Sequence, residues 1–161
     1  MSKTIPRYEI LRDTREQTGW WFTEDAQCFG TTEATLETGD YTLKGLEKIL
    51  AIERKGSVSE FATNINEKRF DAELDRLDEF DHAFLLLDFN PDDLEKYPYG
   101  SNIPLYKQKY IKVTPNYIRS KIIDYSLRHS TQILITGGHG KKYALDIFRK
   151  TWAYYHKNVN G

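Results

Sequence analysis

Residues 49–55 of the chain read Ile-Leu-Ala-Ile-Glu-Arg-Lys. The first four form a continuous apolar run, which is typical of a strand buried on both faces of a sheet. The run turns charged at its C-terminal end, and in open α/β sheets functional sites lie at the carboxyl ends of strands. Because side chains alternate along a strand, Glu53 and Lys55 point to one face and Arg54 points to the other. The stretch therefore predicts a buried strand that ends in a charged site.

Two further acidic residues can join this strand end. Asp40 follows Gly39 in a turn, and a short strand expected at 41–43 can pair beside residues 49–55. Asp13 ends an earlier strand-like segment at 8–13. Mg²⁺ prefers oxygen ligands and keeps several waters, so two carboxylates can hold it together with a substrate phosphate. We expect Asp40 and Glu53 to bind the metal, with Asp13 as a further ligand, directly or through water.

Two carboxylates and a lysine in one cleft suit metal-assisted cleavage of a phosphodiester. A divalent ion activates water, neutralises charge on the phosphate and assists the departing oxygen. Lys55 is expected to position the attacking water or a phosphate oxygen, and Arg54 to hold a neighbouring loop or a phosphate. A Glu-x-Lys triplet alone is common on protein surfaces, so this prediction depends on the buried strand and on the two aspartates.

The remaining segments predict an α/β fold with a central mixed sheet flanked by helices. A helical crossover between the strands at 49–55 and 84–89 predicts a βαβ unit with a parallel pair. Further strands are expected at 31–36 and 132–136. Helices are expected from about Ser57 or Ser59, at 68–80, from Pro115 with Thr114 as its cap, and at 141–156. We expect one domain over residues 1–161, with an irregular insertion at about 90–113.

Composition narrows the class of protein. The chain has 161 residues, enough for a core without disulfides, and its single cysteine, Cys28, favours a reducing cytosolic setting. The balance of 23 basic and 24 acidic residues argues against a protein that coats DNA non-specifically. No apolar run approaches the length of a membrane span, and the N-terminus lacks the apolar core of a signal peptide. We expect a soluble protein that is neither secreted nor membrane-bound.

Several motifs occur in the order found in a known nuclease family. They resemble the XPF-type structure-specific endonuclease domain, and they are Asp13-Thr14-Arg15-Glu16, Gly39-Asp40-Tyr41-Thr42-Leu43, Ile52-Glu53-Arg54-Lys55 and Lys68-Arg69-Phe70. The family belongs to the PD-(D/E)XK superfamily. The resemblance therefore implies the restriction-endonuclease-like nuclease fold.

The resemblance also implies a reaction and roles for single residues. It implies hydrolysis of DNA at branches, flaps or nicks during repair, recombination or phage DNA processing, with Mg²⁺ as cofactor and Mn²⁺ able to substitute. Asp40 and Glu53 would bind the metal and Lys55 would serve the attacking water. The residues implied to support the site or the phosphate are Asp13, Arg15, Glu16 and Arg54.

The sequence departs from the family pattern in two places. The acid that ends the third motif is replaced by Ser59, and Gly56 looks like an inserted residue that brings Glu60 to that position as a supporting carboxylate. This change leaves open an alternative, a catalytically inactive DNA-binding or partner-binding module that keeps the fold. The chain also ends at Gly161 without the helix-hairpin-helix domain usual in the family. Homodimerisation, a partner protein or the insertion would then help to hold DNA.

Other basic and aromatic residues are candidates for DNA contacts. In the run from Tyr106 to Lys112, lysines alternate with aromatic residues, a pattern found in surfaces that bind single strands or flaps. The alternative is that the run is a solvated loop. Trp20, Trp21 and Phe22 either form a wedge beside a DNA junction or pack in the core. The four histidines are not spaced as metal ligands. The candidate DNA-binding residues are Arg69, Lys107, Lys109, Lys112, Lys141 and Lys142.

Overall fold

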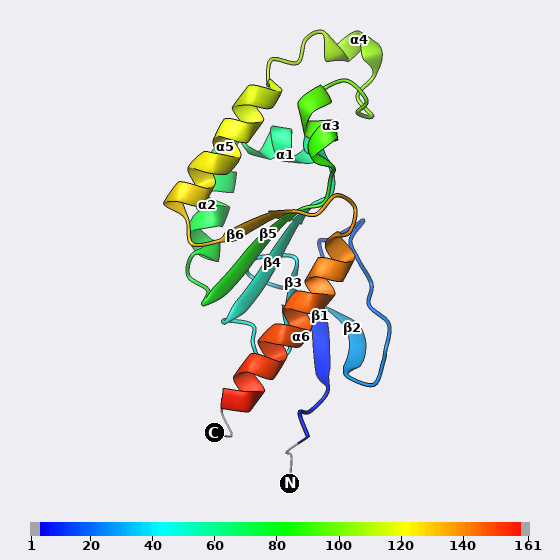
Figure 1. Cartoon of the computed structure of the whole chain (residues 1–161), viewed down its shortest axis with the longest axis vertical. Helices are drawn as coiled ribbons and strands as arrows, with labels where there is room; N and C mark the ends of the chain where they lie inside the picture. The colour runs from blue at the N-terminus through cyan, green and yellow to red at the C-terminus, as the bar shows by residue number, and fades with distance from the viewer. Residues whose placement is uncertain (1–3, 159–161) are drawn as a thin grey trace.

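A six-stranded mixed sheet organises the chain in a computed structural model, which describes residues 4–158 (Figure 1). The first three and last three residues of the domain expected at 1–161 lie outside this range. The sheet order is β2 (Cys28–Ala34), β1 (Tyr8–Asp13), β3 (Tyr41–Leu43), β4 (Leu50–Lys55), β5 (His82–Leu87) and β6 (Gln132–Ile135). Helices flank the sheet, which confirms the predicted fold class.

Strand direction brings the ends of several strands to one edge. β3 runs antiparallel to both of its neighbours, β1 and β4, whereas β1 pairs with β2, β4 with β5 and β5 with β6 in parallel. The parallel strands therefore end at the same edge of the sheet, and β3 begins there. This edge carries Asp13, Asp40 and Lys55.

One face of the sheet is covered by four helices. Phe61 of α1 (Val58–Asn64), Phe70 of α2 (Lys68–Leu77), Leu94 of α3 (Pro91–Lys96) and Tyr125 of α5 (Pro115–Arg128) meet in one buried cluster with Leu85 of β5. Thr114 caps α5 as predicted, because its hydroxyl accepts a hydrogen bond of 3.2 Å from the Tyr117 backbone N–H. The predicted βαβ unit is confirmed, since α1 and α2 connect the parallel strands β4 and β5.

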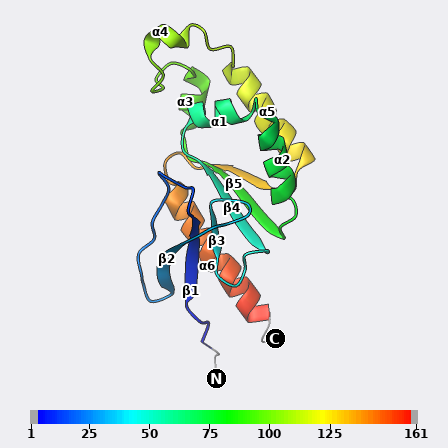
Figure 2. The same ribbon diagram turned by 180° about the vertical axis from the view of Figure 1, so that it is seen from behind.

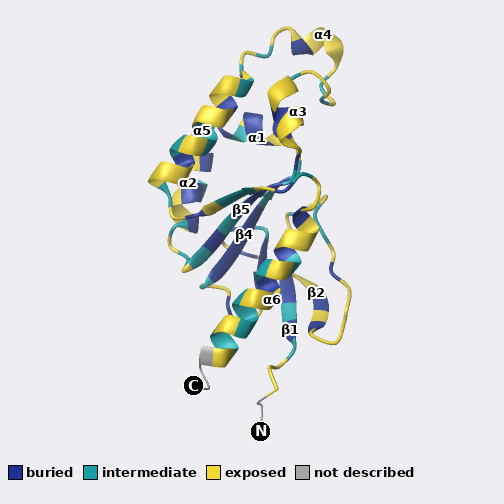
Figure 3. Ribbon diagram, in the orientation of Figure 1, coloured by how far each residue is buried: buried dark blue, intermediate teal, exposed yellow. Residues whose placement is uncertain are grey.

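The other face is covered by one long helix, α6 (Gly140–Asn158), seen crossing the strands in Figures 1 and 2. Phe148 from this helix is fully buried and meets Phe22 edge to face, with ring centroids 5.5 Å apart. Ile52 of β4 and Tyr41 of β3 belong to the same cluster. β4 is therefore buried on both faces, as its apolar sequence predicts (Figure 3).

The structure corrects several predicted boundaries. β2 begins at Cys28 rather than at residue 31, and β5 covers His82–Leu87 rather than 84–89. The stretch 90–113, expected to be irregular, contains α3 and a second short helix, α4 (Leu105–Gln108). In α3, Pro91 occupies the first turn, where its missing N–H costs no hydrogen bond. Proline interrupts regular structure inside a helix but is favoured at its first turn, which is why 90–113 holds more helix than the sequence predicts.

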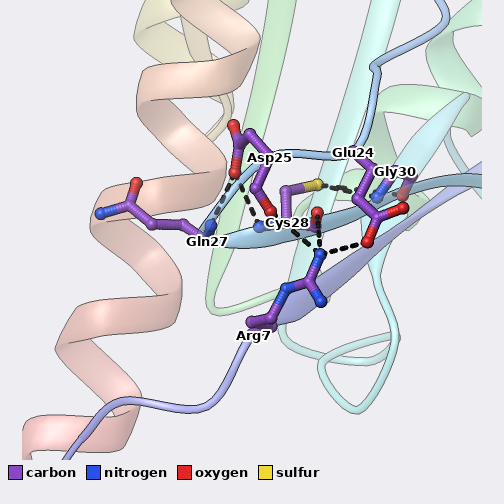
Figure 4. Close-up of polar contacts among 6 residues, drawn as sticks. All are labelled: Arg7, Glu24, Asp25, Gln27, Cys28 and Gly30. Carbon is purple, nitrogen blue, oxygen red and sulfur yellow. Dashed lines mark hydrogen bonds and ion pairs between the residues drawn. The ribbon is translucent and has the colours of Figure 1, made fainter.

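The edge strand β2 is fixed to the N-terminal segment by polar contacts around Cys28 (Figure 4). The Arg7 guanidinium donates to Glu24 at 2.7 Å and to the backbone carbonyls of Asp25 and Cys28. Cys28 is fully buried, and burial raises the pKa of its thiol. In the described part of the chain, no helix is long and apolar enough to cross a membrane.

Replacing Phe148 with alanine is expected to lower the free energy of unfolding by about 3–5 kcal/mol, because the change leaves a cavity between α6 and the sheet. Urea unfolding followed by circular dichroism measures this loss. Tyr143→Ala on the same helix is the matched control, since Tyr143 is 44% exposed. Equal losses in the two variants would contradict the packing described for α6.

Candidate active site

The register of β1, β3 and β4 places three acidic residues on neighbouring strands. The Asp13 backbone N–H donates to the Asp40 carbonyl at 2.8 Å, and the Asp40 N–H donates to the Ile52 carbonyl at 2.8 Å. Because Tyr41 pairs with Ile52 in antiparallel register, Asp40 lies opposite Glu53. The sheet thus brings Asp13, Asp40 and Glu53 together from segments 40 residues apart, as the sequence predicts.

Glu53 and Lys55 lie on the same face of β4 and form an ion pair. The Lys55 Nζ is 3.2 Å from Glu53 Oε1, and the two side chains are only 8% and 7% exposed. The ammonium group also lies 5.2 Å from the ring centroid of Phe70. Packing against an aromatic ring holds the lysine side chain in place while its charge faces the carboxylates.

The Asp40 carboxyl group is hydrogen-bonded to the neighbouring strand β4, and its pKa is raised. Its Oδ2 accepts a hydrogen bond of 2.8 Å from the Arg54 backbone N–H. Burial raises the pKa of Asp40 to about 7, and the nearby charge of Glu16 adds to this rise. Glu16 therefore lies near the site, as the resemblance of residues 13–16 to the first family motif implies.

A third acidic residue near Lys55, Glu73 of α2, was missed at the sequence level. The carboxyl groups of Glu53 and Glu73 are within hydrogen-bonding reach of each other. Burial raises the pKa of Glu53 well above its ordinary value, and the charges of Asp40 and Glu73 raise it further. Burial alone would lower the pKa of Lys55, but the charges of Glu53 and Glu73 outweigh it and raise that pKa.

The helical spacing of apolar residues in α2 could have indicated that Glu73 faces the site. It lies three residues after Phe70 and one before Leu74, both of which are buried. It therefore stands at the edge of the inward face of α2, and it is half-buried. A half-buried glutamate on the helix that follows the strand motif marks a residue that faces the site.

The charge and the oxygen donors of this set suit a divalent metal ion, although the ligand atoms of its three acidic residues do not gather within 4.8 Å of one another in the described structure. Asp40, Glu53 and Glu73 supply three carboxylates, and Lys55 is the only ammonium that shares their buried surroundings among the residues 4–158. The exposed guanidinium of Arg15 contributes at the rim. An excess of buried negative charge with oxygen ligands is suited to a hard cation such as Mg²⁺.

The Asp13 side chain supports the site from behind. Its Oδ1 accepts a 3.0 Å hydrogen bond from the Leu36 backbone N–H, and its Oδ2 accepts one of 2.8 Å from Arg15 Nε. Arg15 also donates to the Leu36 carbonyl. Both carboxylate oxygens thus fix the segment between β2 and β3 that leads to Asp40. The arrangement suits an organising role for Asp13 and Arg15 better than direct ligation.

Arg54 points to the opposite face of the sheet, as strand alternation predicts. Its guanidinium lies 5.1 Å from the ring centroid of Trp20, which stacks on Tyr41 at 5.3 Å. Phe22 is buried in the core, and Trp21 is half-exposed beneath the guanidinium of Arg12. The aromatic run therefore packs mainly within the protein, and Arg54 fixes it there.

Glu60 organises the turn after β4. Its Oε2 accepts a 3.0 Å hydrogen bond from the Gly56 N–H, while the Ser57 hydroxyl accepts one of 3.1 Å from the Glu60 N–H. These reciprocal bonds resemble a capping box at the start of α1. Glu60 also adds to the negative charge felt by Lys55. Its position is consistent with a supporting carboxylate.

The predicted DNA-binding residues occupy three separate regions. Arg69 lies on the outer side of α2 and pairs with Glu67, whereas Lys107, Lys109 and Lys112 are exposed within or just after α4. Lys141 and Lys142 lie in the first turn of α6. The N-terminus of α6 is already capped, because Asp88 Oδ1 accepts a 2.8 Å hydrogen bond from the Gly140 N–H.

Among the described residues, the one group of three acidic or histidine side chains whose ligand atoms lie close together is elsewhere. The ligand atoms of Asp75, Asp78 and His129 lie within 4.8 Å of one another, although histidine spacing gave no sign of such a group. Asp78 Oδ2 is 2.6 Å from His129 Nδ1, and its Oδ1 accepts from Ser130 and Thr131. These contacts join α2 to the turn between α5 and β6, which accounts for the cluster as a structural junction.

Comparisons with known proteins agree with the predicted resemblance. The model of the ERCC4 domain matches residues 12–140. The structure of XPF from Aeropyrum pernix in complex with DNA matches 90% of this chain and 65% of that chain, with a TM-score of 0.62 at 16% identity. Another structure of the Aeropyrum pernix XPF matches 79% of this chain and 52% of that chain, with a TM-score of 0.53 at 15% identity. The chain thus spans between about half and two thirds of those proteins, and no curated protein sequence matches it.

The raised pKa of Asp40 predicts a pH dependence of stability in metal-free protein. The folded protein keeps a proton on Asp40 that the unfolded chain releases between its ordinary value of 3.8 and about 7, so the free energy of unfolding falls as pH rises through this window. Asp40→Asn should reduce this fall by at least about 1.4 kcal/mol, the equivalent of one pKa unit. Urea unfolding in EDTA at several pH values measures it.

The exposed residue Asp146 provides the matched control, as Asp146→Asn should leave the pH dependence unchanged. An unaltered slope in Asp40→Asn would contradict the electrostatic account of the site.

Proposed function

The chain belongs to the ERCC4 domain family, and we propose that it is a metal-dependent endonuclease that hydrolyses phosphodiester bonds in DNA. The observation that carries the proposal is the buried ion pair of Glu53 and Lys55, with the carboxylates of Asp40 and the half-buried Glu73 adding negative charge around it. Such a set has an excess of negative charge that a divalent cation relieves.

Each residue has a role in this proposal. Asp40 and Glu53 hold Mg²⁺, or Mn²⁺ in its place, and Glu73 either ligates it or hydrogen-bonds Glu53 into position. The bound ion supplies an activated water and neutralises charge on the phosphate. Lys55 keeps its proton because of its carboxylate neighbours, so it donates to the water or to a phosphate oxygen rather than accepting a proton.

The change at Ser59 was the strongest argument for a catalytically inactive module. Glu60, one residue later, accepts from the Gly56 N–H and contributes negative charge near Lys55. The family acid thus has a substitute in the same turn. A module without catalysis has no physical need to bury Asp40 and Glu53 beside each other, since burial disfavours both charges. We therefore favour the enzyme.

For the substrate, we propose branched, flapped or nicked DNA during repair, recombination or phage DNA processing. The support is the family resemblance together with the exposed basic side chains beside the site edge. A basic local surface holds phosphates even when the net charge of the chain is close to zero.

We further propose that the active form is a homodimer. The sheet ends at β6, and beside this edge strand Ile123 and Leu127 of α5 are 60% and 81% exposed. Ile135 of β6 is 40% exposed and lines the same groove of about 600 Å³ as Ile123. Exposed apolar side chains next to an unpaired strand edge favour association with a second copy of the surface.

Purified protein with Mg²⁺ or Mn²⁺ is expected to cleave at least one of labelled flap, fork, nicked and linear DNA. Glu53→Gln should lower the cleavage rate by more than about 100-fold, since it removes a direct ligand, whereas the loss of supporting groups costs about 10–100-fold. Glu73→Gln should fall in that lower range. Lys55→Ala should abolish cleavage but leave metal affinity, measured by calorimetry, largely unchanged.

Glu79→Gln is the control, because Glu79 is exposed in the turn that follows α2. Absence of cleavage with every substrate and both metals would contradict the enzyme proposal. Full activity in Glu53→Gln would contradict the assignment of the site.

Leu127→Glu should convert the dimer to a monomer, because a charge cannot be buried in the apolar contact. Light scattering coupled to gel filtration gives the molar mass. Ser126→Glu on the same helix is the control, since Ser126 is exposed but polar. A monomeric wild-type protein at high concentration would overturn the dimer proposal.

A further inference from the structure

The segment from Lys96 to Ile123 has a charge distribution unlike the rest of the chain. It contains no acidic residue, in a protein whose formal net charge is −1. Its cations are Lys96, Lys107, Lys109, Lys112, Arg119 and Lys121. A local excess of positive charge of this kind attracts a polyanion even though the whole molecule does not.

The same segment exposes aromatic rings. Tyr99, Tyr106 and Tyr110 are 70%, 68% and 72% exposed, and they are among the most exposed large side chains in the described part of the chain. Lys107 lies 5.7 Å from the ring centroid of Tyr106, and Lys109 lies 5.2 Å from that of Tyr110. Rings with ammonium groups beside them offer stacking and phosphate contacts together.

The exposure of these rings is fixed by the backbone beneath them. Gln108 is buried, and its side-chain amide donates to the Ile103 carbonyl at 2.8 Å. Ile103, Ile111 and Val113 pack against the main hydrophobic cluster. Because residues four apart share one side of a helical turn, Tyr106 and Tyr110 face away from the buried Gln108 between them. The segment around α4 projects beyond the sheet in Figures 1 and 2.

We propose that this surface binds unpaired DNA. We call it the α4 platform and define it by Tyr106, Lys107, Lys109, Tyr110 and Lys112. Stacking on a tyrosine ring requires an accessible base face, which a single strand offers and an intact duplex does not. In the described part of the chain, none of the three lysines forms an ion pair, so all remain available to phosphates.

The chain that leads into the α4 platform lies near the end of β4. A cavity of about 280 Å³ is lined on one side by Gly56 and Ser57, directly after Lys55, and on the other by Tyr97 and Tyr99 at the base of the α4 segment. Neither the platform residues nor Lys55 line this cavity, so it places the base of the platform, and not the platform itself, beside the end of β4. The substrate class that fits both surfaces is a duplex with a single-stranded arm. This inference rests on the proposed function for its cleavage step.

Binding is tested without cleavage by anisotropy of a labelled oligo-dT strand in EDTA. The double variant Tyr106→Ala/Tyr110→Ala should lose about tenfold or more in affinity for oligo-dT, with affinity for a blunt duplex unchanged. Tyr106→Phe/Tyr110→Phe should retain wild-type binding because it keeps both rings. The triple variant Lys107→Gln/Lys109→Gln/Lys112→Gln should lower the slope of log affinity against log salt by about 2.

Tyr143→Ala/Tyr154→Ala is the matched control, because both tyrosines are exposed on α6, away from α4. Unchanged oligo-dT binding in the alanine variant, or an equal loss for the duplex, would overturn the proposal. Loss of binding in the phenylalanine variant would also overturn stacking as its basis. Tighter binding of oligo-U than of oligo-dT would overturn the assignment to DNA.

The outcome is separable from that of the proposed nuclease. Glu53→Gln leaves the platform intact and should bind oligo-dT like the wild type. Binding of oligo-dT without cleavage of any substrate would contradict only the endonuclease proposal. If Tyr106→Ala/Tyr110→Ala leaves the cleavage of duplexes with a single-stranded arm unchanged, only the platform proposal would be contradicted.

Discussion

The antiparallel pairing of β3 with β4 holds two acidic side chains next to each other, and the placement of the other site residues follows from it. Asp40 and Glu53 lie opposite each other in antiparallel register, and burial raises the pKa of both. A single ammonium, that of Lys55, lies 3.2 Å from Glu53. Removing such groups from water disfavours their charged forms, so the arrangement persists only because the surrounding fold imposes it. The short strand β3, antiparallel between β1 and β4, is the element that imposes it.

The surrounding fold is built to hold this junction. Two hydrophobic clusters, one on each face of the sheet, sandwich β4, so its position cannot shift without exposing apolar surface. Asp13 and Arg15 fix the segment that leads into Asp40, and Glu60 fixes the turn that follows Lys55. Arg54 anchors the aromatic segment on the far face. Supporting contacts thus surround the carboxylates on every strand that contributes one, as rigid placement of a catalytic group requires.

Much of this was predictable because it follows from local rules. Alternation along β4 separates Arg54 from Glu53 and Lys55, and the apolar run at 49–52 marks a central strand. Other features depend on tertiary packing. The approach of Glu73 requires the angle at which α2 crosses the sheet, which helix periodicity alone does not give. The capping of α6 by Asp88 joins residues 52 positions apart. The stretch 90–113 is predicted to be irregular, although Pro91 begins α3 there. Predictions failed where a residue contacts an element distant in the sequence, or where the same residue type is found in two kinds of structure.

The central claim is that the buried carboxylates form a binding site for a divalent metal ion. Anomalous scattering from crystals soaked in Mn²⁺ tests it most directly, since the ion is located without reference to activity. We expect a peak beside the carboxyl groups of Asp40 and Glu53, near Lys55, and its loss in Asp40→Asn. A peak at Asp75, Asp78 and His129 alone, or no peak at Asp40 and Glu53 at saturating Mn²⁺, would contradict it.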